Sequence, residues 1–115
     1  MSAQDNLSGE QFKDYSFKFT PGQDTESELS LHRVDALHKG KSVGFLDWHP
    51  YLREGELQHI EVDPAHRRKG LATAMWNFAK TQEGGDELHH GRERTDEGEA
   101  WAKSTKEPMP KRVKV

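Results

Sequence analysis

Residues 60–72 read IEVDPAHRRKGLA, and the hydrophobic period changes within this stretch. The segment ELQHIEV (56–62), which leads into it, alternates as a half-buried β-strand does. Asp63-Pro64 interrupts the alternation, because proline cannot donate to a sheet and restricts the residue before it. In GLATAMWNFAK (70–80) the apolar residues recur at helical spacing instead. The stretch therefore predicts a strand that is followed directly by an amphipathic helix.

Three more strands are predicted upstream of this junction: DYSFKFT (14–20), ELSLHRVDAL (28–37) and SVGFLDWHP (42–50). The turn signal HKGK (38–41) joins the last two into a hairpin. In the strand 56–62, alternation places the side chains on two faces. One face is expected to hold Glu56, Gln58, Ile60 and Val62, and the other Leu57, His59 and Glu61.

Downstream, a glycine C-cap at Glu83-Gly84-Gly85 is expected to end the long helix. A short strand is expected around residues 87–89. RTDEGEAWAKS (94–104) predicts a short helix, with Thr95 or Asp96 as N-cap and with Ala100 and Trp101 facing inward. The order of elements predicts an α+β fold: an antiparallel-rich mixed sheet of about four to five strands, one long helix and one short C-terminal helix.

The composition limits the class of protein. The 115 residues fit one domain, which we place at 13–104, between a flexible lead-in (1–12) and a basic C-terminal tail (105–115). Residues 103–115 carry five basic residues against Glu107, and such a tail is expected to be solvated. The absence of cysteine excludes thiol nucleophiles, thiolate metal sites and disulfides. With no membrane-length apolar run and no signal-peptide pattern, we expect a cytoplasmic protein without a membrane partner.

Four cationic or titratable residues, His66, Arg67, Arg68 and Lys69, precede Gly70 at the predicted start of the long helix. The first backbone N–H groups of a helix have no partner within it, and the helix dipole adds partial positive charge there. A glycine at the turn lets an oxyanion approach the backbone. The junction therefore predicts a site for a phosphate or pyrophosphate. Neither common glycine-rich phosphate loop is present, since the chain has no G-x-x-x-x-G-K-[ST] run and no G-x-G-x-x-G after a strand.

The run from Arg67 to Ala72, preceded by Val62-Asp63-Pro64, resembles the [Q/R]-x-x-G-x-[G/A] acyl-CoA motif of the GNAT N-acetyltransferase superfamily. The resemblance implies that backbone amides from Arg68 to Thr73 hold the pyrophosphate of coenzyme A. It also implies that the strand pairs with the pantetheine arm and splays from its neighbour, leaving a V-shaped gap for the thioester. The implied cofactor-binding residues are Ile60, Glu61, Val62, Arg67, Arg68, Lys69, Gly70, Leu71, Ala72 and Thr73.

By register with the family, Glu56 stands where several members carry a general base. Many members use a tyrosine on the last helix as general acid, but this helix carries Trp101. Ser104, His89, His90 or solvent could take that role, and the sequence does not rank them. Only PGQDTES (21–27) stands where the family inserts acceptor-covering helices, so an open acceptor groove is expected.

The resemblance implies an N-acyltransferase that moves an acyl group from acetyl-CoA, or a related acyl-CoA, directly to a primary amine in a ternary complex. The acceptor could be a small amine or a protein lysine or N-terminus, and a homodimer is left open. The alternative is a catalytically weak or inactive coenzyme A-binding module with a regulatory or interaction role. A metal site is not expected, because Glu56 and His59, like His89 and His90, should point apart on a strand. Nucleic-acid binding is disfavoured, because nothing around the basic turn is basic or aromatic in a groove-reading pattern.

Overall fold

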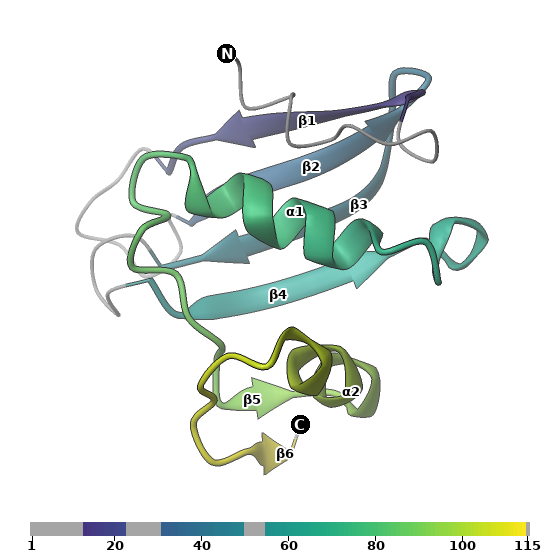
Figure 1. Cartoon of the computed structure of the whole chain (residues 1–115). Helices are drawn as coiled ribbons and strands as arrows, with labels where there is room; N and C mark the ends of the chain where they lie inside the picture. The colour runs from purple at the N-terminus through teal and green to yellow at the C-terminus, as the bar shows by residue number, and fades with distance from the viewer. Residues whose placement is uncertain (1–12, 23–30, 50–54, 115) are drawn as a thin grey trace.

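The computed structural model describes residues 13–22, 31–49 and 55–114. Its main sheet has four antiparallel strands in chain order (Figure 1). They are β1 (Tyr15–Thr20), β2 (His32–His38), β3 (Lys41–Trp48) and β4 (Leu57–Val62). A single turn of 3-10 helix, η3 (Pro64–His66), follows β4 and leads to helix α1 (Leu71–Lys80), which crosses one face of the sheet. The predicted α+β fold is confirmed.

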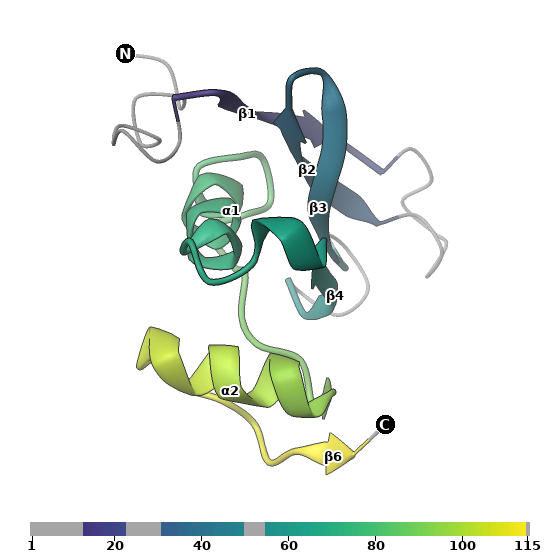
Figure 2. The ribbon, with the colours of Figure 1, turned by 90° about the vertical axis from the view of Figure 1, so that its right-hand side faces the viewer.

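The C-terminal segment from residue 93 forms a second layer beside the edge of β4 (Figure 2). Strand β5 (Glu93–Arg94), helix α2 (Asp96–Thr105) and strand β6 (Val113–Lys114) make up this layer. Strand β5 pairs with β6 in parallel and does not join the main sheet. The predicted short strand at 87–89 is therefore wrong: that segment makes one isolated bridge, from His89 to Glu56.

The hydrophobic core lies between the main sheet and α1. Val34, Leu46 and Trp48 point from the sheet toward the helix and are fully buried. Met75 of α1 is equally buried, and Phe78 meets Phe17 of β1 edge to face, with 5.3 Å between ring centroids. Burial of this apolar stripe fixes the position of α1, and thereby of the junction before it, on the sheet.

A β-bulge in β4 changes the faces that alternation predicted. Leu57 pairs with Trp48, but the next pair is His59 with Asp47, so Gln58 has no partner of its own. The extra residue turns Leu57 to the core side, where it is 9% exposed. The prediction that Leu57 shares a face with His59 and Glu61 was wrong for this reason.

Of the two expectations about helix caps, one needs correction and the other is confirmed. Helix α1 ends at Lys80 with Thr81 as its C-cap in a right-handed conformation, so no glycine caps it. Gly85 serves a close approach instead, because a Cβ there would lie 1.8 Å from the carbonyl oxygen of Ala79. In α2, Thr95 is the N-cap, as one of the two predicted alternatives, and its hydroxyl accepts a hydrogen bond from Gly98 N.

Of the two residues of α2 that were predicted to face inward, one is exposed. Ala100 is exposed, whereas Ala102 is buried and Trp101 is half-buried. The face toward α1 is set by contacts that are distant in sequence, such as those of Trp101 with Thr73 and Trp76. The prediction for Ala100 was therefore wrong.

The basic C-terminal segment contacts the rest of the protein. The Glu107 carboxylate accepts hydrogen bonds from Trp76 Nε1 at 2.8 Å and from Lys80 Nζ at 2.6 Å. Val113 N donates to Arg92 O at 2.8 Å. The expectation that the tail is solvated does not hold at these residues.

Several sequence expectations fall outside the described residues. These are the lead-in 1–12, the start of the second predicted strand at 28–30, most of PGQDTES, and the end of the third predicted strand at residue 50. Among the described residues, no helix is long and apolar enough to cross a membrane.

Candidate functional site

The junction between β4 and α1 has the geometry of an anion cradle. The N-cap of α1 is Gly70, in the left-handed region with φ of 80°, and no side chain caps the helix. Arg68 also has a positive φ, of 62°. The first amides of α1 therefore face outward without an intrahelical acceptor, flanked by Arg67 and Arg68.

A gap opens beside this cradle, along the free edge of β4. At its closed end, Leu57 N donates to His89 O at 2.9 Å, and His89 N donates to Gly55 O at 3.0 Å. Gly91 lies so close that a Cβ there would be 2.3 Å from Leu57 O. Beyond Gly91 the chain turns away to β5, so no strand of the described residues covers the edge of β4 from Ile60 onward.

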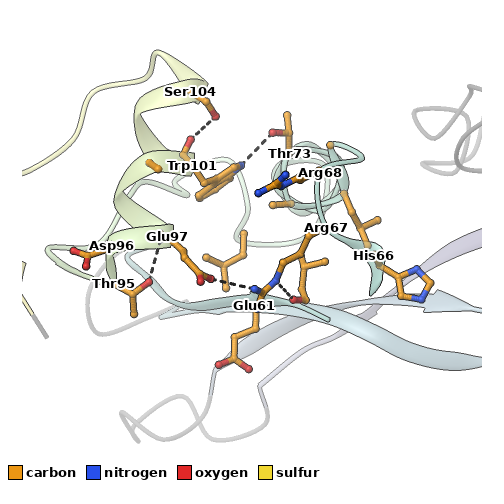
Figure 3. Close-up of a pocket in the computed structure, with 17 residues that line it drawn as sticks. Glu61, His66, Arg67, Arg68, Thr73, Thr95, Asp96, Glu97, Trp101 and Ser104 are labelled. Carbon is orange, nitrogen blue, oxygen red and sulfur yellow. Dashed lines mark hydrogen bonds and ion pairs between the residues drawn. The ribbon is translucent and has the colours of Figure 1, made fainter. Parts of the chain in front are cut away.

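The gap is a cavity of about 980 Å³ between β4, the start of α1 and one side of α2 (Figure 3). All the implied cofactor-binding residues except Lys69 line it. The full lining is Ile60, Glu61, Val62, His66, Arg67, Arg68, Gly70, Leu71, Ala72, Thr73, Thr95, Asp96, Glu97, Gly98, Ala100, Trp101 and Ser104.

Sequence reasoning considered Trp101 and Ser104 of α2 for the site but missed the rest of the wall that this helix contributes, Glu97 above all. Glu97, Trp101 and Ser104 follow each other at helical spacing and face the cavity together (Figure 3). That spacing was visible in the sequence. Nothing local, however, shows that this face of α2 lies across the gap from α1.

Arg67 extends from the cradle across the gap. Its Nε donates to the backbone carbonyl of Val62 at 2.8 Å, and its Nη1 lies 3.6 Å from the Glu97 carboxylate (Figure 3). One guanidinium thus links the edge of β4 to the first turn of α2. The cavity contains both signs of charge, because Arg67, Arg68, Asp96 and Glu97 all line it.

Trp101 joins the two helices at the cavity wall. Its Nε1 donates to Thr73 Oγ1 at 3.1 Å, and its ring meets Trp76 edge to face at 5.3 Å. Behind it, His90 stacks on Trp76 at 4.5 Å and is 1% exposed. Burial lowers the pKa of His90, partly offset by the charge of Glu107. Thr105 Oγ1 donates to Ala102 O and therefore accepts a hydrogen bond from His90 Nε2. The buried Nδ1 of His90 has no hydrogen-bond partner among the described residues.

The candidate proton donors occupy different environments. Ser104 lines the cavity, and its hydroxyl donates to Trp101 O. His90 is buried behind Trp76, and His89 is exposed with its Nδ1 near Glu87 O. Of these three side chains, therefore, only Ser104 lines the gap.

Glu56 lies at the closed end of the gap and is half-buried. Its Cγ would be 3.6 Å from a Cβ placed on Gly91, but Glu56 is not part of the cavity lining. It stands four positions before Ile60, which corresponds to about 13 Å of extended chain. An acyl chain would have to extend along β4 from the cradle to reach it.

A separate pair lies on the sheet face that α1 does not cover. His59 Nδ1 is 2.9 Å from Asp47 Oδ1, and the carboxylate is largely buried while the imidazole is exposed. Burial raises the pKa of Asp47, and the hydrogen bond and charge of His59 oppose this. Over the described residues, no group of three or more His, Cys, Asp or Glu side chains is arranged to hold a metal ion.

Comparison with known proteins agrees with this geometry. Searches of curated proteins and of solved structures gave no match. The family model for the acetyltransferase (GNAT) family matches residues 4–92, which include β4, the cradle and the whole of α1. Because this match covers most of the chain, the protein belongs to the acetyltransferase (GNAT) family.

Proposed function

We propose that this protein transfers an acyl group, most simply acetyl, from acyl-CoA to a primary amine within a ternary complex. The observation that carries the proposal is the uncapped start of α1, which opens onto a cavity bounded by a free strand edge. A diphosphate suits the first feature and an extended amide-containing arm suits the second. The cavity volume lies near the upper end of the range of about 300–1,000 Å³ that is usual for ligand sites.

In this proposal the backbone amides from Arg68 to Thr73 bind the diphosphate, with the side chains of Arg67 and Arg68 adding charge-assisted hydrogen bonds. The backbone of Ile60, Glu61 and Val62 pairs with the pantetheine arm. Leu71 and Ala72 offer no polar side chain there, so their part is to present backbone. Lys69, outside the lining, contributes long-range attraction.

Glu56 is the proposed general base. The bound thioester supplies an electrophilic carbonyl carbon, to which the amine nitrogen bonds as the C–S bond breaks. The Glu56 carboxylate, directly or through one water, takes the proton that the amine loses. We assign to Ser104 the relay of a solvent proton to the leaving thiolate, because it lines the cavity.

The test has two parts. Calorimetry with coenzyme A measures the cradle, and a thiol-release assay with acetyl-CoA, a panel of small amines and lysine peptides measures transfer. Glu56→Gln removes the base with little change in shape, so turnover should fall by about 100-fold or more while coenzyme A affinity stays within about twofold. Unchanged turnover across pH in this variant would remove Glu56 from the mechanism.

A coenzyme A-binding module without turnover is the second candidate. One observation favours it: α2 carries Trp101 where many family members have an acid tyrosine. Heat on titration with coenzyme A, together with no thiol release for any acceptor, would support the module over the transferase. Absence of both heat and thermal stabilisation would reject both.

A further inference from the structure

We infer that Glu97, on the first turn of α2, sets the affinity of the gap for the acyl donor by holding Arg67 across it. The inference rests on the proposed function, since it concerns the same cavity. Glu97 is thus an affinity-determining residue, which competes with the diphosphate for the guanidinium of Arg67.

The two contacts of Arg67 are both contacts that a bound donor would need to replace. The Nε of Arg67 donates a hydrogen bond to the carbonyl oxygen of Val62 at 2.8 Å, on the strand edge where the pantetheine arm is proposed to pair. Nη1 faces Glu97 at 3.6 Å rather than the uncapped start of α1. In this arrangement the guanidinium lies across the gap and is engaged on both sides (Figure 3).

Glu97 is distinct from the other acids at the start of α2. Asp96 lines the cavity but pairs with Arg112 at 2.9 Å, and Glu99, which is not part of the lining, pairs with Arg94 at 3.1 Å. Within the described part of the chain, the ion-pair partner of Glu97 is Arg67. The first turn of a helix favours acids in general, but only this one is aimed at the cradle.

The pair is weak enough to open when a donor binds. The side chains of Arg67 and Glu97 are 46% and 77% exposed, and exposed ion pairs change an equilibrium constant by at most about fivefold. Glu97 also repels a dianion held nearby, which adds a few-fold effect at physiological salt. Removing the carboxylate should therefore tighten coenzyme A binding by about three- to tenfold.

The experiment measures coenzyme A binding by calorimetry in the full-length protein and in Glu97→Gln. Glu93→Gln is the matched control, because Glu93 is exposed, lies four residues earlier and does not line the cavity. We expect a three- to tenfold lower Kd for Glu97→Gln and less than a twofold change for Glu93→Gln. The gain should shrink at about 0.5 M salt, where screening is stronger.

A double-mutant cycle with Arg67→Gln tests whether Glu97 acts through Arg67. Arg67→Gln alone should weaken binding, and Glu97→Gln should then bring a clearly smaller gain, because the guanidinium for which Glu97 competes is gone and only its direct repulsion of the dianion is relieved. An equal gain with and without Arg67 would overturn the inference, as would an unchanged or weaker affinity in Glu97→Gln alone. If the unmodified protein gives no heat and no thermal stabilisation with coenzyme A, the proposed function itself fails.

Discussion

Gly91→Ala tests whether the closed end of the gap depends on the contact between Gly91 and β4. An alanine Cβ would lie 2.3 Å from Leu57 O, and about 1 Å of movement is needed to reach ordinary van der Waals contact. The obstructing atom belongs to the backbone, so the segment 89–91 must move away from β4. Overpacking of this kind costs about 1–3 kcal/mol. The bonds Leu57 N to His89 O and His89 N to Gly55 O would weaken as well, at about 1 kcal/mol each.

The expected loss in the free energy of unfolding is therefore about 3–5 kcal/mol, with weaker coenzyme A binding because the closed end of the gap widens. Urea unfolding followed by tryptophan fluorescence measures the first effect, and calorimetry the second. Gly40→Ala is the control: its φ of +84° is unfavourable for alanine, yet nothing lies within 4 Å of the added methyl group. It should cost about 1–2 kcal/mol and leave binding unchanged. If Gly91→Ala costs no more than Gly40→Ala and binds coenzyme A equally well, the closed end is not held by this contact.

Two further predictions concern the cluster behind the cavity. Trp101→Phe removes the hydrogen bond to Thr73 Oγ1 but keeps an aromatic ring on Trp76. Coenzyme A affinity should therefore fall by about two- to fivefold in calorimetry, and the free energy of unfolding should fall by about 1 kcal/mol. An affinity equal to that of the wild type would show that this bond does not shape the cavity wall. Burial holds the pKa of His90 below its usual 6.5, so the unfolded chain takes up the proton first, and stability is complete above about pH 6.5 and falls as pH decreases below it. In urea unfolding, His90→Phe should therefore lose less stability than the wild type when the pH falls from 7.5 to 5.5. An identical loss would assign the pH dependence to other groups, such as the buried His32, whose pKa is also lowered by burial.

Much of the fold follows from local patterns in the sequence. The change of period at residues 60–72 indicates β4 and α1 because one buries alternate residues and the other buries a helical stripe. The turn HKGK gives the hairpin of β2 and β3. The cradle follows from one glycine before an apolar helix, with cations beside it. Each of these features is encoded within about ten residues of chain.

The rest depends on partners that are distant in sequence. The bulge at Gln58 arises in the pairing with β3, and it moves Leu57 into the core without any local signal. Gly84 and Gly85 look like a helix stop, but Gly85 is needed for close packing against Ala79. Trp101 meets Thr73 across 28 residues, so the pattern of α2 cannot show what its face contacts. Pairing register and helix docking are therefore the levels at which sequence reasoning failed here.

The wall of the gap is held by residues beyond the segment that matches the family. Arg94, which is 8% exposed, donates to Glu99 on α2 at 3.1 Å, to the carbonyl oxygen of Pro110 at 2.9 Å and to that of Gly91. A buried guanidinium is stable only when its donors are satisfied in this way. The Arg94 side chain therefore links the closed end of the gap, the wall formed by α2 and the C-terminal segment. Because these three parts share one buried charge, the position of α2 beside β4 depends on the tail as much as on the helix itself.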